Sequence, residues 1–232
     1  MADYDLYYWP VPFRGQFIRA ILAHAGKRWT EHDADAIGAL MSRDPARQPV
    51  AFMGPPVLVD KAADVALAQM PAIAVYLGDT LGLIEDDPAQ RARTAKIVND
   101  ANDVIDELTL NGGRQMWTKP KWKAFVPRLE EWMAIWEAEA ARNGVTDDAG
   151  WMLGAKQPGV ADIVTSTLWS TMGDRFPPLR DMLDATAPRT ASLCRRLQET
   201  PPLKALAKKA REDYGDAYCG GEIEKSLRAV VG

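Results

Sequence analysis

The stretch PPVLVDKAADVALAQMPAIAVYLGDTLGL, residues 55–83, decides how the first part of the chain folds. Its proline-led apolar run at 55–60 is typical of a strand, and the short run at 65–68 predicts the second strand of a hairpin. Pro71 then opens an apolar-periodic segment that Gly78 ends, because proline suits the first turn of a helix and glycine its end. The stretch therefore predicts strand, strand and helix in that order.

Upstream of this stretch, the sequence predicts two further strands. Residues 4–9 are rich in aromatic strand formers and stop at a proline, and residues 29–32 form a second short candidate strand. Apolar residues at helical spacing in 16–25 predict a helix that Gly26 ends, and residues 37–42 are a candidate short helix. The expected order is β-α-β-(α)-β-β-α.

Beyond Pro88 the strand signals fade and helical periods dominate. The expected helices cover 88–110, 121–141, 160–172, 182–199 and 202–214. We therefore expect a first domain at 1–82, a linker at 83–87 and an all-helical domain at 88–232.

The composition is that of a globular protein, with 47% apolar residues over 232 positions. A net charge of −4 argues against nucleic acid as a partner, and no apolar run is long enough to predict a membrane span. The N-terminal residues lack the layout of a signal peptide, so a cytoplasmic location is expected. Two cysteines and two histidines predict neither a disulfide framework nor a metal site.

Several short motifs follow one another along nearly the whole chain. They are Tyr8-Trp9-Pro10-Val11-(Pro12-Phe13)-Arg14-Gly15, Pro56-Val57-Leu58, Gln69-Met70-Pro71-Ala72-Ile73-(x2)-Tyr76-Leu77-Gly78 with Leu81-Gly82-Leu83, Trp151-Met152-Leu153-Gly154 followed by Val160-Ala161-Asp162, and Pro202-Leu203-Lys204-Ala205. In this order they resemble the cytosolic glutathione transferase family, in particular its tyrosine-type classes (alpha, mu, pi and sigma). The resemblance implies an α/β thioredoxin-like N-terminal domain plus an all-α C-terminal helical domain. It also implies glutathione as co-substrate and a homodimer.

The resemblance implies that Tyr8 is the catalytic residue. A glutathione thiol near pKa 8.5 is only a few per cent ionised at neutral pH. A tyrosine hydroxyl that donates a hydrogen bond to the sulfur favours the thiolate. The alternative is that Tyr8 is a plain aromatic strand residue, since Tyr4 and Tyr7 lie close by.

The resemblance also implies where glutathione binds, with two departures from the family pattern. The implied glutathione-binding residues are Pro55, Pro56, Val57, Gln69, Met70, Arg14 and Asp103. In the family the residue before the cis-proline offers both its N–H and its C=O, but Pro55 has no N–H. The family's serine hydroxyl for the glutamyl carboxylate is absent at Met70, which keeps only its N–H. Side chains that could compensate are Arg14, Gln16, Arg43, Arg47 and Gln48.

The hydrophobic substrate site is expected at Trp9, Val11, Met116 and Trp117, although core packing is the alternative for the aromatic residues of this region. Asp162 is expected to cap a helix rather than to act in catalysis. No cysteine or serine occurs in residues 8–16, and Cys194 and Cys219 are expected to lie away from the site.

The first hypothesis for function is a glutathione transferase that activates the thiol through Tyr8 for attack on small hydrophobic electrophiles or peroxides, a detoxification role. The second is a non-catalytic ligand-binding or interaction protein of the same fold with an eroded glutathione site. A third is a related transferase that takes a different thiol or acid.

Overall fold

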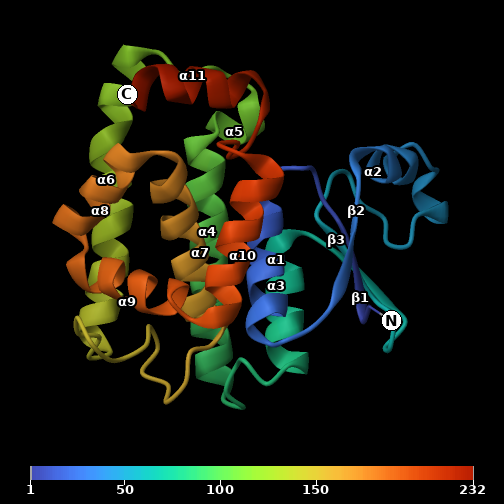
Figure 1. Cartoon of the computed structure of the whole chain (residues 1–232), viewed down its shortest axis with the longest axis horizontal. Coiled ribbons are helices and arrows are strands. Elements are labelled where there is room, and N and C mark those ends of the chain that lie inside the picture. Colours follow the sequence, from blue (N-terminus) through green and yellow to red (C-terminus); the bar gives the residue numbers. More distant parts are fainter. Residues whose placement is uncertain (1, 232) are drawn as a thin grey trace.

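The computed structural model describes residues 2–231, and it begins with a mixed four-stranded sheet (Figure 1). The strands are β1 (Tyr4–Tyr7), β2 (Trp29–His32), β3 (Val57–Asp60) and β4 (Val65–Ala68). Their order is β2-β1-β3-β4, with β1 parallel to β2 and antiparallel to β3, and β3 antiparallel to β4. The hairpin and both upstream strands are therefore confirmed.

Helices cover both faces of the sheet, with α1 and α3 between the sheet and the helical half and α2 on the opposite side (Figure 1). Their bounds are α1 (Phe13–His24), α2 (Ala34–Met41), the short 3₁₀ helix η1 (Pro45–Arg47) and α3 (Met70–Thr80). Gly26 follows α1 with φ 65°, which confirms its expected role in ending that helix. Gly78 does not end α3, so that expectation is wrong. A Cβ at Gly78 would lie 2.5 Å from Ile84 and 2.7 Å from Val160, so close packing explains the glycine.

The rest of the described chain is helical and confirms the expected fold class. Its helices are α4 (Pro88–Leu108), α5 (Leu110–Gly113), α6 (Lys119–Arg142), α7 (Val160–Arg175), α8 (Pro177–Thr186), α9 (Pro188–Gln198), α10 (Pro201–Tyr214) and α11 (Gly221–Val231). The single helix expected at 182–199 is two, because Ala187 has a non-helical backbone and Pro188 begins a new helix after it. Helix α11 was not predicted. Among residues 2–231, none of the helices has both the length and the apolar character that a membrane crossing requires.

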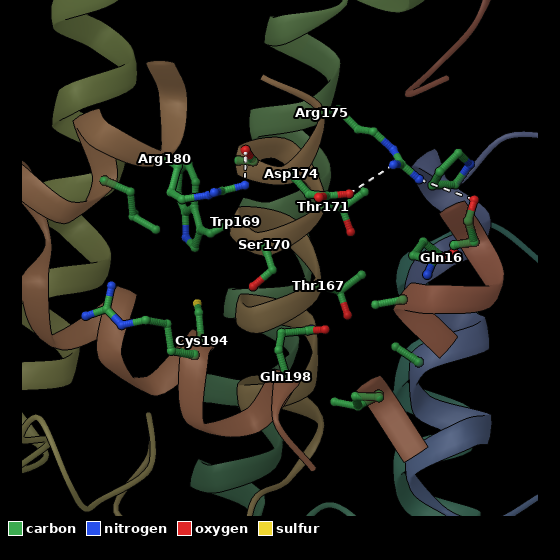
Figure 2. A pocket seen from close by; sticks show the side chains of 18 of the residues that line it. Gln16, Thr167, Trp169, Ser170, Thr171, Asp174, Arg175, Arg180, Cys194 and Gln198 are labelled. Atoms are coloured by element: carbon green, nitrogen blue, oxygen red, sulfur yellow. Dashed lines mark hydrogen bonds and ion pairs between the residues drawn. The ribbon is translucent and has the colours of Figure 1, made fainter. Parts of the chain in front are cut away.

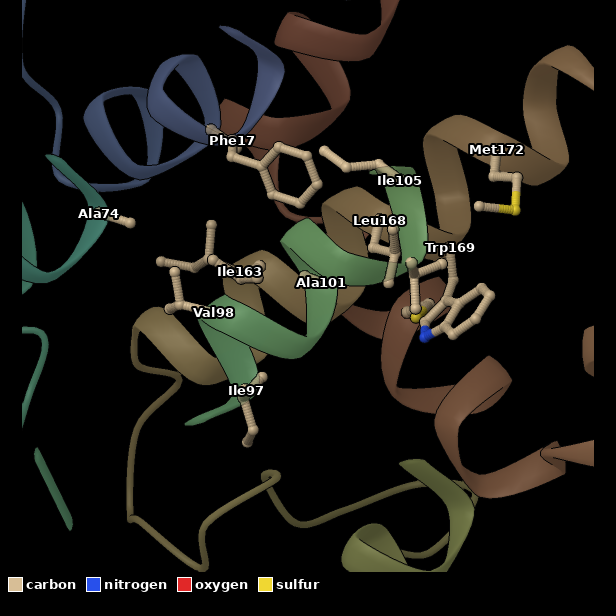
Figure 3. Packing of buried hydrophobic residues seen from close by; sticks show 14 of the residues in the cluster. Phe17, Ala74, Ile97, Val98, Ala101, Ile105, Ile163, Leu168, Trp169 and Met172 are labelled. Atoms are coloured by element: carbon tan, nitrogen blue, oxygen red, sulfur yellow. The ribbon is translucent and has the colours of Figure 1, made fainter. Parts of the chain in front are cut away.

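One hydrophobic core runs through both halves of the molecule. Figure 3 shows Phe17 of α1 close to α4 and α7, with Ile105 and Leu168 among its neighbours. All three side chains are buried, and burying a side chain of this size contributes about 1.5–3 kcal/mol. The backbone also joins the halves, since the Val160 N–H donates to Leu83 O at 3.0 Å. These contacts hold α1 firmly, and α1 carries the residues that surround Tyr8.

Candidate active site

Three segments that are far apart in the sequence meet at one end of the sheet. Tyr8 follows the last residue of β1, and Tyr7 pairs with Val57, the first residue of β3. Val57 in turn pairs with Ala68, the last residue of β4, after which Gln69 leads into α3. The sheet register thus places the ends of these segments side by side.

The loop before β3 and the start of α3 present backbone groups at this end. The Pro55–Pro56 peptide bond is cis, as expected. Gln69 is exposed and has φ 74°, and its side chain does not cap α3. The first-turn N–H groups of a helix of this length attract an anion. Met70 is the first helical residue and its side chain is 1% exposed, so it points into the core and only its backbone is available.

Tyr8 is almost fully buried, with 3% of its surface exposed. Its phenolic oxygen accepts a hydrogen bond from the backbone N–H of Arg14 at 3.0 Å. Burial raises the pKa of Tyr8 to about 12, although the guanidinium groups of Arg14 and Arg19 oppose this rise. At neutral pH the hydroxyl therefore keeps its proton. It is a hydrogen-bond donor there and not a base.

Gly15 lets the Tyr8 ring lie against α1. A Cβ at this position would lie 2.3 Å from Cδ1 and 2.6 Å from Cγ of Tyr8, closer than real contacts allow. The ring is also within cation–π range of Arg19, whose guanidinium carbon lies 5.7 Å from the ring centroid. Arg19 is itself held by an ion pair to Glu31. Gly15 and Arg19, one turn apart on α1, therefore hold the Tyr8 ring against this helix.

We expect Gly15→Ala to lower the free energy of unfolding by about 1–3 kcal/mol. Overpacking of this kind outweighs the roughly 1 kcal/mol that alanine gains over glycine inside a helix. Chemical denaturation followed by circular dichroism measures the effect. The control is Gly38→Ala in α2, where no atom lies within 4 Å of the added Cβ and stability should stay equal or rise slightly. Equal stabilities for the two variants would contradict the proposed contact with Tyr8.

Arg14 connects the α/β half to α4. Its Nε donates to Asn102 Oδ1 at 3.3 Å, and its Nη2 pairs with Asp106 Oδ1 at 3.2 Å. Asp106 was missed from the sequence, although it lies one helical turn beyond Asn102 and so shares its face. Asp103 is exposed, and the slight desolvation of its carboxyl together with the neighbouring carboxylates of Asp100, Glu107 and Asp106 raises its pKa. The structure brings Arg14 to Asp106 and leaves the role of Asp103 as a prediction.

The C-terminal segment packs against the start of α1, which corrects the expectation that Cys219 lies away from the site. The Phe13 N–H donates to Tyr218 O at 3.2 Å, and the two rings make an edge-to-face contact. Burial raises the pKa of the Cys219 thiol to about 12, and the Arg14 guanidinium opposes this rise. The charge of Cys219 in turn contributes to the raised pKa of Tyr8. Glu224 fixes the segment by accepting the backbone N–H groups of residues 218–220. No local sequence pattern predicts a contact between residues that are about 200 positions apart in the chain.

The four residues expected at the hydrophobic substrate site fall into two groups. Trp9 and Val11 are partly buried beside Tyr8 in the chain and pack against the core. Trp117 is 6% exposed and its indole N–H donates to Leu108 O at 2.8 Å. It belongs to an aromatic cluster whose other members are Trp122 and Phe125. Met116 next to it is exposed, so a substrate role for either stays a prediction.

The side chains that could compensate for the two departures are placed differently. Gln48 is tied into its own loop, since its Oε1 accepts the Phe52 N–H at 2.9 Å. Arg43 and Arg47 are exposed, and Gln16 is buried within α1. No group of three or more His, Cys, Asp or Glu side chains among residues 2–231 is arranged to hold a metal ion.

Comparisons with known proteins support the architecture. A family model described as "Glutathione S-transferase, C-terminal domain" matches residues 93–230. No curated protein is matched by sequence. Among solved structures, the fold is similar to a pi-class glutathione S-transferase of Onchocerca volvulus, with TM-score 0.73 and 17% identity over 94% of this chain and 98% of the other. It is also similar to a glutathione S-transferase from Ascaris lumbricoides, with TM-score 0.70 and 21% identity over 90% and 97%.

A further similar structure, Na-GST-3 of Necator americanus, is described as monomeric, with TM-score 0.70 and 19% identity over 90% of this chain and 97% of the other. At these identities the solved structures establish likeness of fold. The family model covers more than half of the sequence, and with the sheet, the cis-proline loop and the helical half it leads to one conclusion. The chain belongs to the glutathione S-transferase family.

Proposed function

We propose that this protein is a tyrosine-type glutathione transferase, in which the Tyr8 hydroxyl stabilises the thiolate of bound glutathione. The observation that carries the proposal is a buried phenol with a pKa near 12 at the end of β1. The backbone N–H of Arg14 occupies a lone pair of its oxygen, so the O–H hydrogen is available to a sulfur. A donor that stays protonated can stabilise the anion without taking its proton.

In the proposed reaction the thiol of glutathione releases its proton to solvent, and the thiolate attacks an electrophilic carbon. With an aryl halide a C–S bond forms and halide leaves. The donor in this step is Tyr8, and preorganised donors of this kind are worth more in a site that excludes water. Small hydrophobic electrophiles and peroxides are the substrate classes, and Trp9 and Val11 are the nearest apolar candidates.

The residues around Tyr8 fit part of a tripeptide thiol. The uncapped start of α3 suits the glutamyl carboxylate, and the exposed Gln69 is available beside it. The fit is incomplete, because Pro55 lacks an N–H and the Met70 side chain is buried. One neutral hydrogen bond is worth about 0.5–1.5 kcal/mol and one to a charged group about 1.5–3. We therefore expect glutathione to bind about ten- to a thousand-fold more weakly than in a site with both groups.

The test is retention on glutathione-agarose followed by a conjugation assay with 1-chloro-2,4-dinitrobenzene. We expect weak retention, elution by free glutathione, and measurable turnover. Cysteinylglycine is the matched control for elution, because it keeps the thiol and lacks the glutamyl group that the start of α3 would hold. It should elute the protein less well at equal concentration.

Two outcomes separate the alternatives. Binding without turnover would favour a non-catalytic ligand-binding or interaction protein of the same fold. Elution by cysteinylglycine as efficient as by glutathione would remove the glutamyl assignment and favour a transferase for a different thiol. The homodimer that the resemblance implies and the cytoplasmic location both stay predictions.

A further inference from the structure

Basic side chains gather where α5 ends and α6 begins. Residues 108–129 contain five lysine or arginine residues and no aspartate or glutamate, although the whole chain carries a net charge of −4. Arg128 is paired with Glu107. The other four are exposed, and among residues 2–231 no carboxylate lies within 4.0 Å of any of them. We call these four the basic corner, and they are Arg114, Lys119, Lys121 and Lys123.

Many other basic side chains of the helical half have carboxylate partners. In the wall of the cavity drawn in Figure 2, Arg175 pairs with Asp174 at 2.9 Å. Three lysines of α10 also lie within 4.0 Å of a carboxylate, and they are Lys204, Lys208 and Lys209. A neighbouring carboxylate cancels much of the attraction between a cation and a distant anion. The basic corner keeps its charge, and the positive end of the α6 dipole adds to it.

An exposed apolar side chain lies within the basic corner. The Met116 side chain is 38% exposed. Lys121 Nζ donates to Gln115 Oε1 at 2.9 Å and to Met116 O at 3.5 Å, which holds this turn against the start of α6. The next residue, Trp117, is buried and packs edge to face on Trp122, with ring centroids 5.2 Å apart. A thioether therefore lies among cations on a rigid aromatic base.

The C-terminal helix fixes the basic corner at one end of the molecule. The Trp117 N–H donates to Ser226 Oγ at 3.0 Å, and a Cβ at Gly113 would lie 3.4 Å from Ile223. Figure 1 shows α11 beside α5 and one end of α6, and the three helices are in contact there. The corner is thus a surface of defined shape.

This combination of charges and an apolar side chain favours an anionic phospholipid surface as the partner. Lysine and arginine are attracted to the negative charge of such a surface, and an apolar side chain among them enters the boundary between headgroups and acyl chains. A phosphodiester backbone offers the thioether no apolar partner.

The charges beyond the basic corner also favour a membrane over a nucleic acid. The next carboxylate on α6 is Glu130, seven residues after Lys123 and so about 10 Å further along the helix. That distance exceeds the Debye length of about 8 Å at physiological ionic strength, so a bilayer that touches only the corner is little repelled by it. A polyanion that extends past the corner meets the negative charge of the rest of the chain.

We propose that the basic corner is a peripheral docking surface for membranes that contain anionic phospholipids. The four cations supply the attraction, and Met116 enters the headgroup region. Docking of this kind needs no membrane-spanning helix. It does not depend on Tyr8 or on glutathione.

The experiment measures cosedimentation of the full-length protein with phosphatidylcholine vesicles that do or do not contain phosphatidylserine. We expect binding only to the anionic vesicles, and binding at least about tenfold weaker in about 0.5 M salt than in about 0.1 M salt, because salt screens the attraction. The triple variant Lys119→Gln, Lys121→Gln, Lys123→Gln should weaken binding at least about tenfold. Met116→Ser should weaken it about threefold and leave its salt dependence unchanged, because it removes only apolar contact.

The matched control is the triple variant Lys204→Gln, Lys208→Gln, Lys209→Gln, which removes the same charge from α10. It should bind anionic vesicles within about twofold of the wild type, and circular dichroism checks the fold of every variant. Equal losses in the two triple variants would mean that only net charge matters, which would overturn the proposal. It would also be overturned by equal binding to both kinds of vesicle, by no binding to anionic vesicles, or by tighter binding to a short DNA duplex at equal phosphate concentration.

Discussion

Replacing Tyr8 with phenylalanine should lower the turnover number for aryl halide conjugation at least about tenfold and raise the thiol pKa of bound glutathione. The substitution removes only the hydroxyl, and the ring keeps its place against Gly15 and Arg19. Without the donor, the thiolate loses stabilisation, and each tenfold loss of rate corresponds to about 1.4 kcal/mol. The pH profile of single-turnover conjugation measures both quantities, since its inflection reports the thiol pKa in the complex.

Tyr7→Phe is the control for this prediction. Tyr7 is the neighbouring tyrosine on the other face of β1, where its ring stacks on His32 with centroids 4.0 Å apart. Its loss of a hydroxyl should leave both turnover and the pH profile unchanged. If Tyr8→Phe behaves like Tyr7→Phe, the phenol does not reach the sulfur, and the tyrosine mechanism is wrong. Circular dichroism of both variants shows whether the fold is kept.

Replacing Asp162 with alanine should lower the free energy of unfolding by about 2–4 kcal/mol at pH 7.5. Its carboxylate accepts the backbone N–H of Met152 at 2.6 Å and that of Gly159 at 2.9 Å, and the residue is 2% exposed. The variant leaves both N–H groups without a partner in the interior, and hydrogen bonds to charged groups contribute about 1.5–3 kcal/mol each. Asp148→Ala, at an exposed loop position, should change stability by less than about 0.5 kcal/mol.

The effect of Asp162→Ala should also depend on pH. Burial raises the pKa of Asp162 from 3.8 to about 6, although the two backbone hydrogen bonds oppose the rise. A raised pKa in the folded state means that the folded protein binds the proton more tightly than the unfolded chain. The stability that this group contributes is then complete below pH 4 and declines as the pH rises through about 6. Urea denaturation should therefore show a larger difference between wild type and variant at pH 4.5 than at pH 7.5. A difference that grows with pH would contradict this assignment.

Asp162 also shows which interactions the sequence could predict and which it could not. Its position three residues into α7 predicted the bond to Gly159, because capping is a local rule of spacing. The bond to Met152 crosses a loop of irregular backbone, and no spacing rule predicts it. The same division holds for Arg14. Its motif could be recognised in the sequence, but its ion pair with Asp106 could not be predicted.

Predictions from local sequence rules were wrong at two positions whose surroundings are set by tertiary packing. Gly78 was expected to end a helix, but it lies inside α3, and the residue is a glycine because Ile84 and Val160 leave no room for a Cβ. Cys219 was expected to lie in a glycine-rich tail away from the site. Instead, α11 and Glu224 hold that segment against Phe13. In both cases the deciding contact joins residues that the sequence places in different elements.

By itself, the sequence determined the strands, the proline-led hairpin, the long helices of the second half and their order, because hydrophobic period, proline and glycine act over a few residues. Tertiary structure alone decided that Tyr8 is buried with its oxygen on the Arg14 N–H, that the C-terminal segment covers the start of α1, and that Met116 is exposed within the basic corner. Burial and pKa depend on which distant side chains exclude water from a group, and only the packed chain specifies those neighbours.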